Sequence, residues 1–369
     1  MGLHLVPNDL NIDFVGFRRI SYIISAVLII VGISSIIIKG GLRYGIDFEG
    51  GAVIQIKFDN AISDETIKNA LADSELPGLV VQGFGDDSTG YLLRVSMQDN
   101  ASAAAIRESV DTDLHSKLAG EKYEISRLEI VGPKVGADLR SKALGALYLA
   151  TLLMAVYVSG RFEHRWGTAV LMAAGLSGSI YILDLLGLPK GWQVCGVALS
   201  TLFICWRLKL AFALGALISV IHDLLVTVGL FSILNKEFDL TIIAALLTVV
   251  GYSINDTIIV YDRIRENFRA DKKASLATII NNSINQTLSR TVLTSGTTLM
   301  VIVALLILGG DIIHDFALAL LIGIAIGTFS SIFVASPILM TFENTLRSRQ
   351  AKEEEASRLA ARRRAAPQV

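Results

Sequence analysis

The stretch LTIIAALLTVVGYSINDTIIV, residues 240–260, decides the fold of this chain. It matches the run of about 20 mostly apolar residues that a helix needs to cross the roughly 30 Å hydrocarbon core of a bilayer. Seven further apolar segments reach or approach that length: 20–38, 140–160, 168–188, 192–206, 210–233, 289–309 and 315–341. The sequence therefore predicts a polytopic α-helical membrane protein with eight apolar segments.

Two of these segments have more than one interpretation. Segment 192–206 covers only about 22 Å at 1.5 Å per residue, so it either borrows residues from its flanks or is re-entrant. Segment 20–38 follows Arg18 and Arg19, as the apolar part of a signal peptide would. It is long for that role, and no small-x-small cleavage site follows it. We therefore interpret 20–38 as an uncleaved first span.

Basic residues beside the segments predict the orientation, because cytoplasmic loops are rich in lysine and arginine. They precede the first segment and follow the second, fourth, sixth and eighth: Arg18, Arg19, Arg161, Arg165, Arg207, Lys209, Arg263, Arg265, Arg269, Lys272, Lys273, Arg347, Arg349, Lys352 and Arg362 to Arg364. The opposite short loops hold only Lys190 and Lys236. We therefore expect both termini in the cytoplasm, with region 42–138 outside.

The outer region 42–138 has the pattern of one small α/β domain. Its predicted elements are a strand 46–58, a helix from Ser63 to Pro77-Gly78, strands 79–84 and 90–97, a helix 103–118 and a strand 123–131. Ser63 suits a helix N-cap. The order βαββαβ is the ferredoxin-like split arrangement, in which two helices cover one face of the sheet. The other face is then either free for a partner or merely solvated.

The rest of the chain divides around this domain. Residues 1–41 form a cytoplasmic N-terminus and the first span, and residues 139–343 form the transmembrane bundle. Residues 344–369 are rich in Lys, Arg, Glu and Ala without an apolar face, which predicts a charged cytoplasmic tail.

An ionisable side chain inside a span is costly and marks a candidate functional site. Asp256 lies within 240–260, and Thr248, Tyr252 and Ser253 share its helix face, with Asn255 beside it. Such a polar stripe must face other helices rather than lipid.

Arg290 opens the next long segment, with Thr294 and Thr297 on its face. The two segments run antiparallel across a cytoplasmic loop, so we expect Asp256 and Arg290 to meet at similar depth. They form either an ion pair that fixes helix register or a proton-carrying site, where the carboxylate alternates between a protonated state and an arginine-paired state.

Three other features of the spans are weaker candidates. His222 and Asp223 lie near the middle of 210–233, but neighbouring residues on a helix point about 100° apart, so we expect only one of them to be a primary member of a site. His314-Asp315 is expected at the membrane interface. The spacing from Gly323 to Gly327 predicts close helix packing.

Several classes of function have no support in the sequence. Basic residues flank apolar segments instead of lining one soluble face, which argues against nucleic-acid binding. The two cysteines, Cys195 and Cys205, lie in one apolar stretch without a Cys–His constellation, so neither a zinc site nor a disulfide framework is expected. With no catalytic triad, P-loop or dinucleotide fingerprint, we expect neither an enzyme nor a bound cofactor.

The order of several motifs resembles the SecF branch of the SecD/SecF family, within the resistance-nodulation-division superfamily. The matching stretches are Gly45-Ile-Asp-Phe-Glu-Gly-Gly51, Gly132-Pro-Lys-Val-Gly136, Arg161-Phe-Glu163, Ala213-Leu-Gly-Ala216 leading to His222-Asp223, Gly251-Tyr-Ser-Ile-Asn-Asp256, Tyr261-Asp-Arg-Ile-Arg-Glu-Asn267 and Ser289-Arg-Thr291. In the first of these, Gly45, Asp47, Gly50 and Gly51 form the family motif after the first span, and its glycines shape a tight exit into the domain.

This resemblance implies an accessory subunit of the bacterial Sec translocase in the inner membrane. Such a subunit works with a SecD partner, the SecYEG channel and YajC, and uses the proton motive force to help unfolded secretory chains finish crossing. The resemblance also implies that Asp256 and Arg290 are the residues of the transmembrane proton pathway.

In one respect the chain departs from the family pattern, which has six spans. Residues of about 164–206 separate Arg161-Phe-Glu163 from the next core helix, giving a six-span core plus an extra apolar hairpin, 164–208. Two rival functions remain open. One is an exporter of small molecules or lipids from the same superfamily, although such proteins typically need two such halves in one chain. The other is a membrane scaffold without ion coupling.

Overall fold

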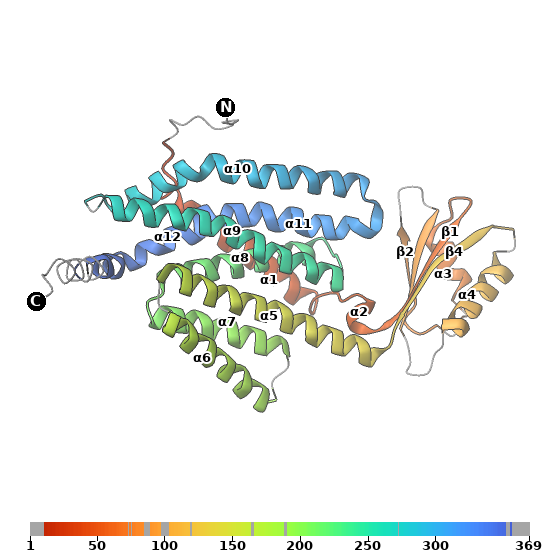
Figure 1. The fold of residues 1–369 in the computed structure, drawn as a ribbon. Coiled ribbons are helices and arrows are strands. Elements are labelled where there is room, and N and C mark those ends of the chain that lie inside the picture. The colour runs from red at the N-terminus through yellow and green to blue at the C-terminus, as the bar shows by residue number, and fades with distance from the viewer. Residues whose placement is uncertain are drawn as a thin grey trace, which may run out of the picture.

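The computed structural model describes residues 11–351 and 355, except for 73, 75, 85–88, 97–102, 119, 164–165, 188–189 and 272. An elongated helix bundle carries the sheet domain at one end (Figure 1). The first described residues lie at the opposite end, where the Ile12 and Val15 amides donate to Asn285 and Asn281 of helix α10. Most of the predicted tail 344–369 lies outside the described residues.

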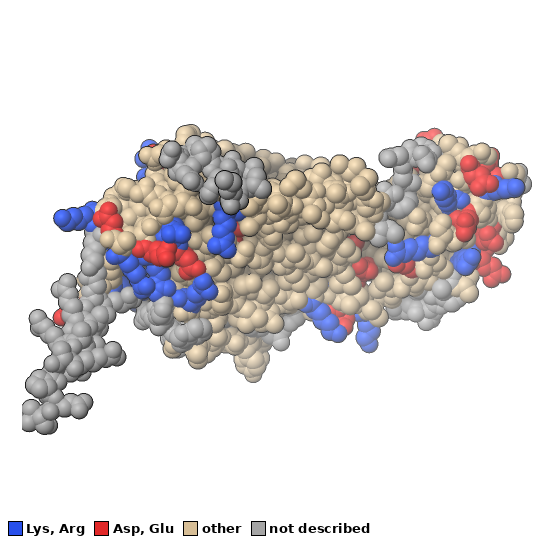
Figure 2. Space-filling view, turned by 45° about the horizontal axis from the view of Figure 1, so that its top comes forward, with Lys and Arg blue, Asp and Glu red and all other residues tan. Residues whose placement is uncertain are grey.

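Six helices among the described residues are long and apolar enough to cross a membrane. Five are single elements, and the sixth runs from Ile313 to Ala351 through several helix types. The elements are α1 (Arg18–Ile38), α5 (Pro133–Glu163), α8 (Ala211–Ile233), α9 (Leu240–Ala270), α10 (Leu276–Leu308), α11 (Gly310–Ser330), the π-helix η1 (Ser331–Ala335), α12 (Ser336–Ile338) and the 3₁₀ helix η2 (Leu339–Phe342). Charged residues gather at the far end and on the domain, with an uncharged belt between them on the face shown in Figure 2.

The inserted residues form a helical hairpin beside α5, made of α6 (Trp166–Leu185) and α7 (Lys190–Arg207) (Figure 1). Helix α7 extends beyond the predicted segment 192–206 at both ends, from Lys190 to Arg207, and it is not one of the six long apolar helices among the described residues. Val197 and Cys205 are buried in the main core of the bundle, whereas Cys195 is exposed. Both helices of the hairpin contact α5, and α7 also contacts α8.

The small domain is a four-stranded antiparallel sheet in the order β2-β3-β1-β4. Alternate residues of β1, including Ile54 and Ile56, face a core that also contains Ile67 and Leu114 from the two helices. The helices therefore cover one face of the sheet. The elements are β1 (Gly51–Phe58), α3 (Asp64–Ala70), β2 (Val80–Phe84), β3 (Gly90–Val95), α4 (Ala103–Lys117) and β4 (Tyr123–Val131).

Two predicted boundaries in this domain are wrong. Residues 46–49 form a short helix, α2 (Ile46–Glu49), and the strand begins only at Gly51, because Gly50 and Gly51 adopt positive φ angles of 78° and 136° that end the helix. The predicted helix from Ser63 stops at Ala70 instead of Pro77, since the chain then turns to bury Leu71. The predicted N-cap is confirmed, with the Ser63 hydroxyl accepting from the Thr66 amide.

Glycines allow two close helix crossings. A Cβ atom on Gly323 would lie 2.2 Å from a methyl carbon of Val249, and one on Gly327 would lie 3.0 Å from the Ser253 Cβ. The small-residue packing face predicted at 323–327 is therefore confirmed, and it brings α11 against α9. In the same way, Gly32 lets α1 approach α8 at Gly229.

Candidate functional site

Asp256 lies on α9 at the centre of the bundle and is 1% exposed. Its Oδ2 atom accepts a hydrogen bond of 3.0 Å from Ser295 of α10, and the Thr328 hydroxyl of α11 lies 3.5 Å from the same oxygen. Its Oδ1 atom has no hydrogen-bond partner among the described residues. A buried carboxylate oxygen without a donor is costly, and a proton on this carboxyl would lower the cost by removing the charge.

The expected direct meeting of Asp256 and Arg290 is not found. Among the described residues no ion pair or hydrogen bond joins them, and Arg290 is exposed. The buried face of α10 at this level is formed by Thr291 and Ser295, and Arg290 points about 100° away from Thr291. Arg290 and Asn255 instead line an open cavity of about 650 Å³.

The cavity has a cationic lining toward the end of the bundle away from the domain. Arg161 and Asp262 form an ion pair of 2.7 Å on its wall, and other arginines of α9 surround it. Its lining residues are Tyr157, Arg161, Asn255, Ile258, Ile259, Asp262, Arg263, Arg265, Glu266, Arg269, Gln286, Thr287 and Arg290. This cavity places a guanidinium and polar space close to the helix face that carries Asp256.

The polar stripe predicted on α9 does not have a single partner: Tyr252 contacts α10, Ser253 contacts α8, and Thr248 bonds within its own helix. Tyr252 donates to the Thr294 carbonyl at 3.0 Å on α10, and Thr294 bonds its own hydroxyl to the Arg290 carbonyl. Thr248 is exposed and donates to the carbonyl of Ala244. Ser253 reaches a different carboxylate, that of Asp223.

His222 and Asp223 are both buried and belong to one site, which corrects the prediction that only one could. The His222 Nδ1 and Asp223 Oδ1 atoms are 2.9 Å apart, and the two residues are 5% and 1% exposed. The two side chains point about 100° apart on α8, yet both are buried. Helices α1, α5, α9 and α11 surround α8 and leave it almost no outer face. The apolar character of α8 all round could not show this in advance, since a helix that faces lipid is apolar on every side as well.

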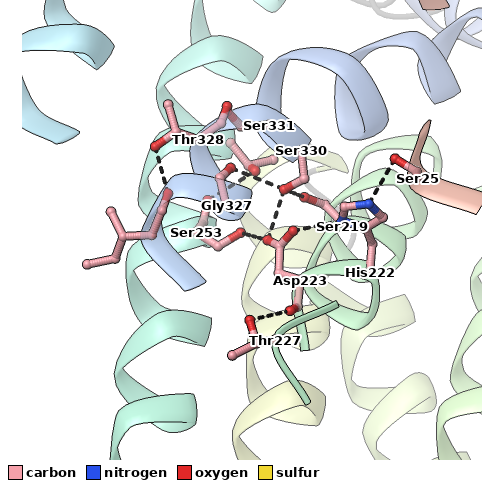
Figure 3. Close-up of polar contacts among 12 residues, drawn as sticks. Ser25, Ser219, His222, Asp223, Thr227, Ser253, Gly327, Thr328, Ser330 and Ser331 are labelled. Carbon is pink, nitrogen blue, oxygen red and sulfur yellow. Dashed lines mark hydrogen bonds and ion pairs between the residues drawn. The ribbon is translucent and has the colours of Figure 1, made fainter. Parts of the chain in front are cut away.

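Hydroxyl groups complete this second centre (Figure 3). Asp223 Oδ2 accepts from Ser253 at 2.5 Å and from Ser330 at 2.9 Å, and the Ser219 and Ser330 hydroxyls are 2.8 Å apart. On the other side, His222 Nε2 lies 2.9 Å from the Ser25 hydroxyl of α1. Ser25, Ser219, Ser295, Thr328 and Ser330 were not predicted as site residues. Their only signal is a hydroxyl group within an apolar segment.

The motif after the first span joins the domain to the bundle. The Gly45 amide donates to the Phe238 carbonyl at 2.8 Å, and Asp47 Oδ2 accepts from the Leu240 amide at 3.1 Å, at the first turn of α9. A Cβ atom on Gly50 would lie 2.6 Å from the Pro133 Cα, so this glycine lets the start of α5 approach. The motif therefore contacts the first turn of the helix that carries Asp256.

Charged residues surround this junction. Arg94 of β3 pairs with Glu237, in the loop between α8 and α9, and Lys236 pairs with Asp315 at 2.6 Å. Asp239 caps α9 by accepting from the Ile242 amide. Burial raises the pKa of Asp239, and the nearby Asp47 carboxylate raises it further. His314 and Asp315 are partly exposed, and their predicted place at the membrane interface stays a prediction.

Comparison with known proteins adds family evidence to this geometry. Residues 112–183 and 190–345 match the family model described as protein export membrane protein SecD/SecF, C-terminal. Residues 35–62, which include Gly45 to Gly51, match the SecD/SecF GG motif.

Individual proteins give the same result. The chain is 41% identical over 347 residues to the protein translocase subunit SecF of Magnetococcus marinus, covering 93% of this chain and 96% of that one. It is 37% identical to the protein of the same name from Vibrio alginolyticus, covering 91% of each chain. The crystal structure of the translocon-associated SecDF of Thermus is similar with a TM-score of 0.67 and 31% identity, over 93% of this chain. This chain spans 40% of that SecDF chain.

Proposed function

The chain belongs to the SecD/SecF family of protein export membrane proteins, on its SecF side, and we propose that it couples the proton motive force to late steps of Sec-dependent protein export. It is a multi-pass protein of the bacterial inner membrane. Its role is that of an accessory subunit, with protons crossing the bundle while a secretory chain crosses the neighbouring channel.

The observation that carries this proposal is the environment of Asp256. The carboxyl is buried, one of its oxygens has no partner among the described residues, and hydroxyls from α10 and α11 contact the other. Such a group can exist protonated and neutral, or ionised when a cation reaches it. Arg290, on the adjacent helix and beside the open cavity, is the nearest candidate for that cation. A permanent structural ion pair would instead show the two groups in contact.

The proposed partner is a SecD subunit. The SecDF chain of Thermus is much longer than this protein, which spans 40% of it. The remaining part of such a chain suggests a separate SecD partner here. An exposed arginine on a membrane helix is unfavourable against lipid, so the face of α9 and α10 that carries Asn255 and Arg290 suits a polar partner helix. We further propose contacts with SecYEG, YajC and the unfolded secretory polypeptide.

The proposed topology has eight membrane segments, both termini in the cytoplasm and the domain outside. It is supported by the six long apolar helices, the added hairpin of α6 and α7, and the location of residues 11–15 at the end of the bundle opposite the domain. The domain is proposed to be ferredoxin-like, a fold whose sheet has the order β2-β3-β1-β4 with both helices on one face.

Helix α9 connects Asp256 directly to the junction between the bundle and the domain. Asp47 contacts the amide of Leu240, at the first turn of α9, and Asp256 lies farther along the same helix. If a change in the charge of Asp256 shifts α9, the contact between Asp47 and the Leu240 amide should shift with it.

The test uses inverted membrane vesicles that contain the full chain with its SecD partner and the channel. Late export of a secreted protein is measured with and without a proton motive force. Asp256→Asn keeps the side-chain size but fixes the neutral form, so the stimulation by the force should be lost. Asp256→Glu should retain part of it, and Arg290→Lys should be impaired because lysine lacks the planar fork of arginine.

Thr248→Val is the matched control, since this exposed hydroxyl on the same helix bonds only its own backbone. Wild-type stimulation in Asp256→Asn would contradict proton coupling and favour the scaffold function. Stimulated export of small molecules or lipids, with protein export unchanged, would favour the exporter.

A further inference from the structure

We propose that Asp223, together with His222, is a second proton-binding site of the bundle, which shares helices α9 and α11 with Asp256. This inference rests on the proposed proton coupling, in which a proton bound here would be one of those that cross the bundle. Whether Asp223 holds a proton can nevertheless be measured independently of Asp256.

The charge balance at this site requires one proton. Asp223 is 1% exposed, and a buried unpaired charge is costly. With a neutral imidazole the pair carries one negative charge; with one added proton it is neutral, either as imidazolium with carboxylate or as imidazole with carboxylic acid. The 2.9 Å contact between His222 Nδ1 and Asp223 Oδ1 lets the proton occupy either residue.

The hydroxyl network accommodates both states without losing a hydrogen bond. When Asp223 is ionised, Ser253 and Ser330 both donate to its Oδ2. When it is protonated, the Ser330 hydroxyl can turn to the Gly327 carbonyl, 3.1 Å away, and accept from the acid instead. Ser219 is 2.8 Å from Ser330 and can donate to it in both states. Ser330 can therefore change from donor to acceptor.

The other ring nitrogen of His222 has a partner that is equally adaptable. Its Nε2 atom lies 2.9 Å from the hydroxyl of Ser25 on α1. A hydroxyl both donates and accepts, so Ser25 can donate to a neutral imidazole or accept from an imidazolium. A proton arriving at His222 thus leaves no buried nitrogen without a partner.

Two helices connect this site to Asp256. Ser253, which donates to Asp223, lies one turn before Asp256 on α9. Ser330 and Thr328, which contact the two carboxyls, are two residues apart on α11. The close contact of Gly327 with Ser253 holds these helices together at this level. Among the described residues no hydrogen bond joins the two clusters, so a proton on one carboxyl would act on the other through the packing of α9 against α11.

Among the described residues, His222 is the one group that forms an ion pair with Asp223. His222 on α8 is the charged or titratable partner of Asp223, and α9 contributes Asp256 one turn from Ser253. The contacts from α1 and α11 are the hydroxyls of Ser25 and Ser330. Among the described residues, no Lys or Arg of α1, α5, α9 or α11 forms an ion pair with Asp223. The alternative role is a permanent imidazolium–carboxylate pair that fixes α8 in the bundle, and such a pair would not titrate.

Infrared difference spectroscopy distinguishes the two roles. The full chain with its SecD partner is reconstituted in vesicles, and the carbonyl band of protonated carboxyl groups is followed as pH changes. We expect two such bands, one absent in Asp223→Asn and the other absent in Asp256→Asn. If Asp223→Asn has the wild-type carboxyl bands at every pH, and the imidazole bands that His222→Gln removes do not change with pH either, the pair exchanges no proton and the proposal is overturned. If the wild type shows the Asp223 band but no band that Asp256→Asn removes, the proposed role of Asp256 fails and this inference about Asp223 still stands.

Proton flux into the same vesicles, reported by an enclosed pH dye, tests the exchange. Asp223→Asn should reduce flux by about 100-fold or more, the scale of a positioned proton-transfer group. Ser330→Ala and His222→Gln should also reduce it and shift the Asp223 carboxyl band. Thr227→Val is the matched control, because this buried hydroxyl on α8 donates only to the Asp223 backbone carbonyl. If Asp223→Asn does not accumulate, unchanged flux and an unchanged band in both Ser330→Ala and His222→Gln overturn the proposal.

Discussion

Gly32 of α1 and Gly229 of α8 are in backbone contact: a Cβ atom on Gly32 would lie 2.7 Å from the Gly229 Cα, and the reverse distance is 2.8 Å. Real Cβ atoms essentially never approach so closely. The crossing is flanked by the Ser25–His222 contact on one side and a 3.0 Å contact between Ser35 and Ser232 on the other. The first helix is thus held to the bundle mainly through α8.

Gly229→Ala should therefore destabilise the protein even though alanine favours helix. Overpacking at a close contact costs about 1–3 kcal/mol, which we expect as a lower midpoint of thermal unfolding in detergent. Gly145→Ala on α5 is the control, because nothing lies within 4 Å of a Cβ there. Its midpoint should stay the same or rise, and equal effects of the two substitutions would contradict the crossing.

Asp47→Asn should loosen the junction between the domain and the bundle. The Asp47 carboxylate accepts from the amide of Leu240, at the positive end of α9. A carboxylate at a helix N-terminus stabilises by about 0.3–1 kcal/mol when exposed, and an amide oxygen retains only part of that. Hydrogen exchange should show faster exchange at the first turn of α9. Glu49→Gln, in the same short helix, is the control and should leave this turn unchanged.

The raised pKa of Asp239 predicts a pH dependence of stability. Between the ordinary Asp pKa of about 3.9 and the higher folded-state value, the folded protein holds a proton that the unfolded chain has released. Stability should therefore fall as pH rises through that window, and the loss should persist at neutral pH.

Asp239→Asn tests this dependence while keeping a good N-cap residue. Its unfolding midpoint should exceed that of the wild type at neutral pH, and the two should converge as pH falls below the ordinary Asp pKa. A wild-type midpoint that is higher at neutral pH would mean that the ionised carboxylate is net stabilising at the N-terminus of α9.

The two cysteines should differ in thiol labelling. Both lie on α7, and Cys205 is fully buried whereas Cys195 is exposed on an apolar helix. Charged thiol reagents should label neither from either side of intact membranes, and a membrane-permeant maleimide should label Cys195 faster than Cys205. Rapid labelling of both by a charged reagent from outside would show that the hairpin is not inserted in the membrane.

Local patterns in the sequence were sufficient for much of the fold. The strand at 123–131 and the Ser63 cap were found as predicted, because alternation and capping depend on neighbours in the chain. The error at Ile46 to Glu49 arose where tertiary contacts intervene. The sequence pattern predicted that a strand starts at these residues, yet they form a helix packed against the start of α5.

The candidate site was only partly predictable, for a related reason. Helical spacing placed Asp256 correctly in the interior, but it could not say which helix covers each side of α9 or α8. Ser253 therefore seemed to belong with Asp256 and instead contacts Asp223. Arg290 seemed ready to pair with Asp256, yet the rotation of α10 turns Thr291 and Ser295 inward. Such details depend on how helices are rotated within the bundle, which one sequence does not state.

The π-helical segment Ser331–Ala335 has a mechanical consequence for the residues before it. A π turn holds one residue more than an α turn, and such turns are frequent at functional sites. If the extra residue passes into the α register, the preceding part of the helix rotates by about 100° relative to the part that follows. Thr328 and Ser330 would then swing away from the carboxyls while the segment from Ser336 onward stayed in place.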